Sequence, residues 1–142
     1  MKYCFLIFLS LSSFLLKGQN ISFKECWKST AVFELAEKMP IPSGGTDSLK
    51  AFFQLAINSW GLNNVSCQLK LRFIINGDGS ACLYMITDPP SNLSISNVVN
   101  TINEMPGWKP AIQNGHQVDC YVNLKMEIES GIITKIIYGN PT

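Results

Sequence analysis

Only a few residues of this chain could carry out nucleophilic chemistry. His116 is the only histidine, and Cys120 follows it closely. A histidine can activate a cysteine where the thiolate is accessible. His116, however, comes directly after the turn residues Asn114 and Gly115, and strand alternation directs Cys120 toward an apolar face. The sequence predicts a solvated turn histidine and no catalytic residue.

The acidic and thiol groups also lack the spacing of a metal site. No two cysteines have the C-x-x-C spacing of redox centres or zinc knuckles. Asp78 with Asn76 falls short of the ligand set of a calcium loop. The other carboxylates considered stand where helix starts and turns need them: Asp47, Asp88 and Asp119. We expect no metal and no cofactor.

Residues 1–18 predict export. Lys2 precedes an apolar run from Tyr3 to Leu16, which is shorter than the about 20 residues that span a bilayer. Cleavage is expected between Gly18 and Gln19, and a segment kept as an anchor is the alternative. Residues 19–31 then form an N-terminal approach segment.

Charge and cysteine content set further limits. Without residues 1–18, nine of the 11 basic residues remain against 10 acidic ones, so no nucleic-acid partner is indicated. An oxidising compartment would let Cys26, Cys67, Cys82 and Cys120 pair. Three connectivities are open.

Two helices are predicted. Prolines and glycines in residues 39–45 (MPIPSGG) break the chain, and Thr46 or Asp47 can cap the helix that follows. Ser94 or Ser96 can cap the second helix, which Pro106 and Gly107 end. The apolar residues at helical spacing are Leu49, Phe52, Phe53, Ala56 and Ile57 in the first, and Ile95, Val98, Val99, Ile102 and Met105 in the second.

Three strands alternate with these helices. Residues 69–75 alternate with period two, residues 76–79 (NGDG) make a tight turn, and residues 80–87 return. A longer strand follows Asn114 and Gly115 over residues 118–128. After the crossover helix, this third strand runs parallel to the second strand. In an all-antiparallel sheet it must therefore pair with the first strand, which gives the order second, first, third. The predicted fold is α+β, with an antiparallel sheet of three or four strands and two helices packed on one face.

Three blocks carry a family resemblance: residues 71–79 (LRFIINGDG), 105–111 (MPGWKPA) and 114–118 (NGHQV). Together with Met39-Pro40 and Gly44-Gly45 upstream, they make residues 32–129 resemble the C-terminal domain of TonB-type energy transducers. Trp108, Pro110 and Gly115 would be its structural motif. The indole is expected to fill the gap between a helix end and the sheet.

The resemblance implies a non-enzymatic, protein-binding domain in the periplasm or cell envelope, linked to transport across the outer membrane. Its partner would be a protein such as an outer-membrane receptor or another envelope complex, bound by β-augmentation. A homodimer through the same edge is a further expectation. The implied partner-binding edge strand consists of Val118, Asp119, Cys120, Tyr121, Val122, Asn123, Leu124, Lys125 and Met126.

Two alternatives stay open. Residues 130–142 form a C-terminal extension, and residues 132–138 (IITKIIY) have strong strand propensity. A strand there would pair with residues 121–128 and cover the binding edge. The alternative function is a secreted small α+β enzyme or inhibitor unrelated to transport, because a fold likeness alone does not fix function.

Overall fold

A computed structural model describes residues 20–23 and 31–139. The predicted signal peptide and Cys26 therefore lie outside the described residues. The elements, in chain order, are β1 (Ile21–Ser22), α1 (Gly45–Ala56), β2 (Cys67–Ile75), β3 (Ala81–Thr87), α2 (Ile95–Asn103), β4 (Ala111–Gln113), β5 (His116–Val118), β6 (Cys120–Glu129) and β7 (Ile132–Gly139).

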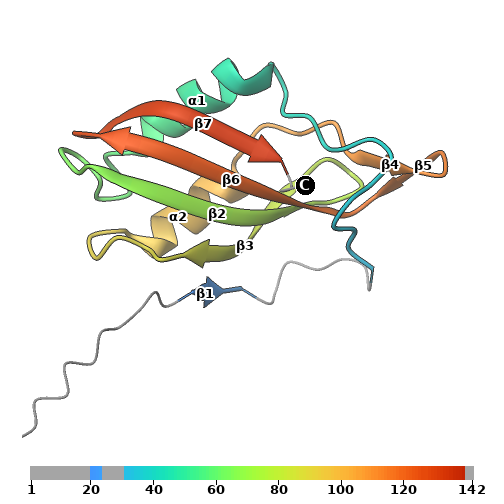
Figure 1. Cartoon of the computed structure of the whole chain (residues 1–142), viewed down its shortest axis with the longest axis horizontal. Helices are drawn as coiled ribbons and strands as arrows, with labels where there is room; N and C mark the ends of the chain where they lie inside the picture. Colours follow the sequence, from blue (N-terminus) through green and yellow to red (C-terminus); the bar gives the residue numbers. More distant parts are fainter. Residues whose placement is uncertain (1–19, 24–30, 140–142) are drawn as a thin grey trace, which may run out of the picture.

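One five-stranded antiparallel sheet organises the chain, in the order β1-β3-β2-β6-β7 (Figure 1). The predicted order of the three main strands is confirmed, since β2 lies between β3 and β6. The tail strand is also present, because β7 pairs antiparallel with β6. β1 adds a two-residue strand beside β3, which the sequence did not predict.

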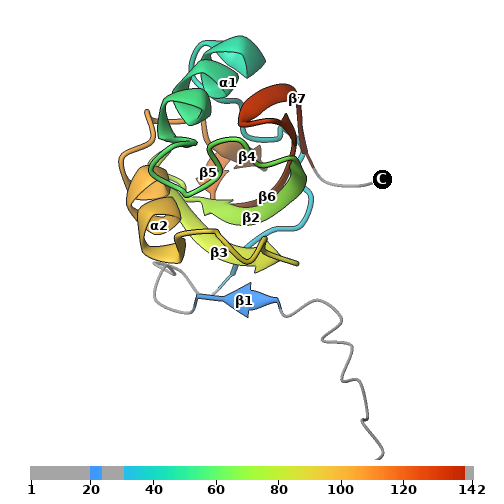
Figure 2. The same cartoon turned by 90° about the vertical axis from the view of Figure 1, so that its left-hand side faces the viewer.

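Both helices lie on the same side of the sheet (Figure 2). We call the opposite side of the sheet the outer face. Apolar residues from both helices and from the helix-facing side of β2, β3, β6 and β7 form one buried cluster. Trp60, Phe53 and Phe73 are among its largest fully buried side chains. Burial of side chains of this size stabilises the fold by about 1.5–3 kcal/mol each.

Trp108 joins α2 to the sheet. It is 4% exposed, and its ring lies edge-on to Phe73 and Tyr138, with centroids 5.5 and 5.7 Å apart. The Trp108 backbone N–H donates to the Gly79 carbonyl at 2.8 Å. The indole thereby fills the space between the end of α2, the β2–β3 turn and the last strand.

The cap predictions need correction. Gly44, in the left-handed conformation at φ 76°, precedes α1, and no side chain caps it. Thr46 and Asp47 lie inside the first turn, because the two glycines have already turned the chain into the helix. Ser94 precedes α2 as predicted but makes no side-chain cap hydrogen bond.

The strand predicted over residues 118–128 is interrupted at Asp119. β5 ends at Val118 and pairs with β4 in a separate two-stranded sheet around the Asn114-Gly115 turn. β6 begins at Cys120. The Asp119 carboxylate accepts the Gly77 N–H at 2.7 Å, so the residue that breaks the strand also holds the β2–β3 turn.

Candidate binding surface at the sheet edge and outer face

β6 is not an edge of the sheet. β2 pairs with one side of β6, and β7 covers the other side from Asn123 to Glu129. At the N-terminal end of β6, the Phe33 N–H donates to the Asp119 carbonyl and the Tyr121 N–H donates to the Phe33 carbonyl, both at 2.9 Å. The prediction of a free binding edge over residues 118–126 is therefore corrected, because β7 and the segment around Phe33 occupy that side.

The end position belongs to β7. It pairs with β6 on one side and has no strand neighbour on the other within the described residues. Ile132 and Ile137 along it are 58% and 47% exposed. We call the unpaired side of this strand the β7 edge.

A single side chain fastens the start of β7 to α1. The Gln54 amide donates to the Gly131 carbonyl at 3.0 Å and accepts the Ile133 N–H at 2.8 Å. Both ends of this side-chain amide thus satisfy backbone groups where β7 begins. Within the described residues, Gln54 makes no hydrogen bond to the β7 edge beyond Ile133, so that part of the edge is not held by this side chain.

Basic side chains gather on the outer face. The register places Lys70 of β2 directly opposite Lys125 of β6, with Thr87 on the far side of Lys70 and Ile137 on the far side of Lys125. A second row across the same strands consists of Met85, Arg72, Asn123 and Gly139.

These two rows line a groove of about 610 Å³, which we call the outer-face groove. Its apolar lining on this face includes Met85 of β3 and Ile137 of β7. Positive charge and apolar surface therefore meet in one depression that reaches from β3 to β7.

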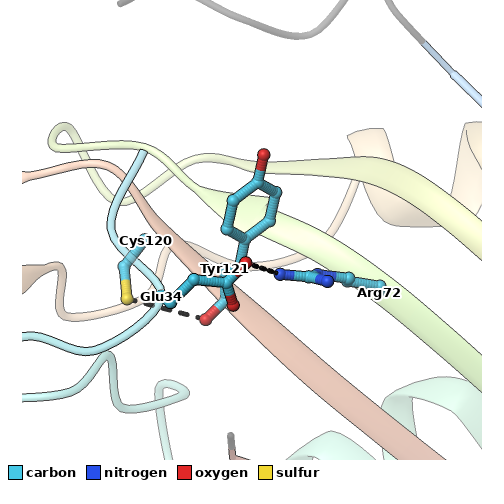
Figure 3. Close-up of polar contacts among 4 residues, drawn as sticks. All are labelled: Glu34, Arg72, Cys120 and Tyr121. Carbon is cyan, nitrogen blue, oxygen red and sulfur yellow. Dashed lines mark hydrogen bonds and ion pairs between the residues drawn. The ribbon is translucent and has the colours of Figure 1, made fainter. Parts of the chain in front are cut away.

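Arg72, which lines this groove, lies beside the ring of Tyr121 and the carboxylate of Glu34 (Figure 3). Its guanidinium carbon lies 4.1 Å from the centroid of the Tyr121 ring and 5.7 Å from that of Tyr84. Glu34, from the segment before α1, forms an ion pair with Arg72. Burial, together with the neighbouring Tyr84, raises the pKa of Tyr121. The cation is thus fixed in place against the sheet.

The two residues considered for nucleophilic chemistry are not brought together as a site. His116 is exposed on β5 next to the turn. Cys120 is fully buried, and burial together with the Glu34 carboxylate raises the pKa of its thiol to about 11. The thiol of Cys120 therefore stays protonated at neutral pH.

The cysteines and possible metal ligands add two findings. Cys67 and Cys120 are free thiols, whereas Cys82 is disulfide-bonded, so neither Cys67 nor Cys120 takes part in the predicted pairing. Within residues 20–23 and 31–139, no three His, Cys, Asp or Glu side chains cluster as metal ligands.

The described helices are too short or too polar to cross a membrane. No family model, curated protein or solved structure matches the chain. The β7 edge and the outer-face groove are the surface features of the described residues that bear on function.

Proposed function

We propose that this chain is an exported, non-enzymatic domain that binds a protein partner of the cell envelope by taking an extended segment of that partner beside β7. The observation that carries the proposal is the end position of β7, which has no strand neighbour on its outer side within the described residues. The backbone N–H and C=O groups of an end strand are ready to pair with an added strand.

The composition of β7 supports this use. Proteins commonly protect exposed edges with short strands, prolines or several charges. β7 has eight residues, IITKIIYG, with one lysine and no proline. Exposed Ile132 and Ile137 offer apolar contacts to an incoming segment. Such an edge is suited to a partner.

The resemblance to the C-terminal domain of TonB-type transducers supports the class of partner. In that family a sheet edge receives a short extended segment of an outer-membrane receptor. We place the corresponding role on β7 instead of residues 118–126. The partner would then be an outer-membrane receptor or another envelope complex, and the domain would serve transport across the outer membrane.

Site-specific photo-crosslinking in the producing cells tests the proposal. A photo-reactive residue replaces exposed Lys135 on β7, and the matched control replaces Leu55, which is 87% exposed on α1. We expect an envelope protein to be crosslinked from position 135 and not from position 55. Mass spectrometry of the product should locate the crosslink in an extended segment of the partner.

Two results would contradict the proposal. Equal crosslinking from positions 135 and 55 would show that β7 has no special role. A product from position 135 containing only a second copy of this chain would make β7 a dimer interface and remove the proposed partner.

A further inference from the structure

Two positively charged side chains of the outer-face groove occupy directly opposite positions on adjacent strands. Lys70 and Lys125 are direct cross-strand neighbours on β2 and β6. Like charges directly opposite each other destabilise a sheet. The Lys70–Lys125 pair therefore lowers the stability of the sheet. Locally unfavourable arrangements of this kind are common at ligand-binding surfaces.

Neighbouring acidic groups do little to neutralise this pair. Among the described residues, the ion pairs involve Arg72 with Glu34 and Lys125 with Glu127, and Lys70 has none. The Lys125 Nζ to Glu127 Oε1 distance is 3.9 Å, at the outer limit of an ion pair. None of the described residues that line the groove is an aspartate or a glutamate. The chain as a whole is near neutrality, with a formal net charge of +1, so this groove is a local concentration of positive charge.

Arg72 supplies a third, fixed cation. Stacking on Tyr121 and pairing with Glu34 hold its guanidinium in one place. Its Nε is buried and lacks a hydrogen-bond partner within the described part of the chain. Because Glu34 already pairs with this guanidinium, the charge left to attract a partner is chiefly that of Lys70 and Lys125.

The groove also continues to the strand that ends the sheet. Ile137, Tyr138 and Gly139 of β7 line it. A segment added beside β7 would direct every second side chain onto the outer face, next to Ile137. Adjacent strands are about 4.8 Å apart, so such a side chain would start about 10 Å from the Lys125 backbone. Extended glutamate and lysine side chains can meet across that separation.

We propose that the outer-face groove selects acidic partner segments: the segment that pairs with β7 carries Glu or Asp at the position beside Ile137, facing Lys125, with Lys70 one strand further along the same row. This inference rests on the proposed function for the position of the segment and adds its charge pattern. The apolar side chains of Met85 and Ile137 and a volume of about 610 Å³ exceed what a single small anion needs, whereas peptide side chains with methylene groups fit both. Charge complementarity of this kind sets which partners bind and how fast they associate.

Binding of two matched octapeptides tests the inference. One alternates Glu and Val, the other Gln and Val, and both have blocked ends. We expect the Glu-Val peptide to bind the mature chain about tenfold more tightly at low salt, as one surface ion pair with Lys125 of up to about 1 kcal/mol and the additional attraction of Lys70 allow. The preference should shrink as salt is added.

Matched double variants identify the lysines responsible. Lys70→Gln/Lys125→Gln should abolish the preference for the Glu-Val peptide. Lys38→Gln/Lys109→Gln changes the net charge equally at exposed positions outside the groove, and should keep it. Circular dichroism verifies that each variant is folded. If both double variants lost the preference for the Glu-Val peptide equally, the preference would depend on net charge and not on the groove, and the inference would be overturned.

Hydrogen exchange separates this inference from the proposed function. If peptide binding protects β7 amides but the Glu-Val and Gln-Val peptides bind equally, acidic selection is wrong and edge binding survives. If the Glu-Val peptide binds through the two lysines without protecting β7, edge pairing is wrong instead. Tighter binding of the chain to anionic lipid vesicles than to the Glu-Val peptide would assign the groove to membranes and overturn the inference.

Discussion

The guanidinium of Arg72 on β2 stacks on the ring of Tyr121 on β6, 4.1 Å from its centroid. The same guanidinium pairs with Glu34, so one cation links two central strands to the segment that precedes α1. That segment also bridges to β6 through Phe33. The side of β6 that would otherwise be open at Cys120 is thereby covered.

Replacing Arg72 with lysine tests how much the stacking contributes. Lysine keeps the charge but lacks the planar group that lies against Tyr121. We expect the free energy of unfolding, measured by urea denaturation, to fall by about 0.5–1 kcal/mol. Glu34→Gln is the control, because its side chain is 65% exposed and exposed ion pairs contribute little. Equal losses in the two variants would mean that the ion pair, and not the ring, holds Arg72.

Gln54 is predicted to hold the start of β7 to α1. Gln54→Ala removes both amide contacts, to the Gly131 carbonyl and the Ile133 N–H. We expect unfolding free energy to fall by about 1–2 kcal/mol and exchange of the Ile133 amide to accelerate. Leu55→Ala, at the neighbouring exposed position of the same helix, should change neither. An unchanged exchange rate at Ile133 in Gln54→Ala would count against the clasp.

The sequence was sufficient to predict the central part of the fold. Period-two alternation gave β2 and β6, the NGDG turn gave the hairpin, and the crossover through α2 gave the order of β3, β2 and β6. The break in the strand at Asp119 was not predicted, because it accompanies a hydrogen bond from the Gly77 N–H to the Asp119 carboxylate. That contact is tertiary and has no local signal in the alternating pattern.

The binding surface was harder to predict for the same reason. Alternation places Lys70, Arg72 and Lys125 on the polar side of their strands, but only the pairing register sets Lys70 opposite Lys125. Sequence alone predicted strand order and not register. The alternative in which a strand at residues 132–138 pairs with residues 121–128 and covers the predicted binding edge is confirmed, because β7 pairs with β6.

The Lys70–Lys125 pair makes a prediction about stability that requires no ligand. Lys70→Gln removes one of two opposed charges, so the melting temperature at low salt should rise by a few degrees, as an about 0.5 kcal/mol gain implies. The difference from wild type should shrink in 1 M salt. Lys109→Gln serves as the control. A lower melting temperature for Lys70→Gln at low salt would show that the pair is not repulsive.

Gly79 is predicted to tolerate no side chain. It has φ 86°, and an added Cβ would come 2.3 Å from the Trp108 carbonyl oxygen. Gly79→Ala should therefore displace Trp108 from the core and reduce unfolding free energy by more than about 2 kcal/mol. Gly115 has φ 76° but no atom within 4 Å of an added Cβ, so Gly115→Ala should cost only about 1 kcal/mol. Tryptophan fluorescence would report the displacement, and similar losses in both variants would contradict the steric argument.

Cys120 is predicted to make the fold sensitive to alkali. Burial and the Glu34 carboxylate raise the pKa of its thiol to about 11, whereas an unfolded chain has a thiol pKa of about 8.5. The folded state keeps the proton where the unfolded state releases it. The contribution of this thiol to stability is therefore complete below about pH 8.5 and is lost as the pH rises through about 11.

Urea denaturation across this pH range measures the effect. Wild type should lose up to about 1.4 kcal/mol per pH unit from this thiol between its two pKa values. Cys120→Ala starts from lower stability, because the sulfur leaves a cavity, but its stability should fall less steeply with pH. The slopes of stability against pH are compared between wild type and variant, because lysines and tyrosines that titrate in the same range contribute equally to both slopes. Parallel curves for wild type and variant would show that the thiol of Cys120 ionises freely in the folded state.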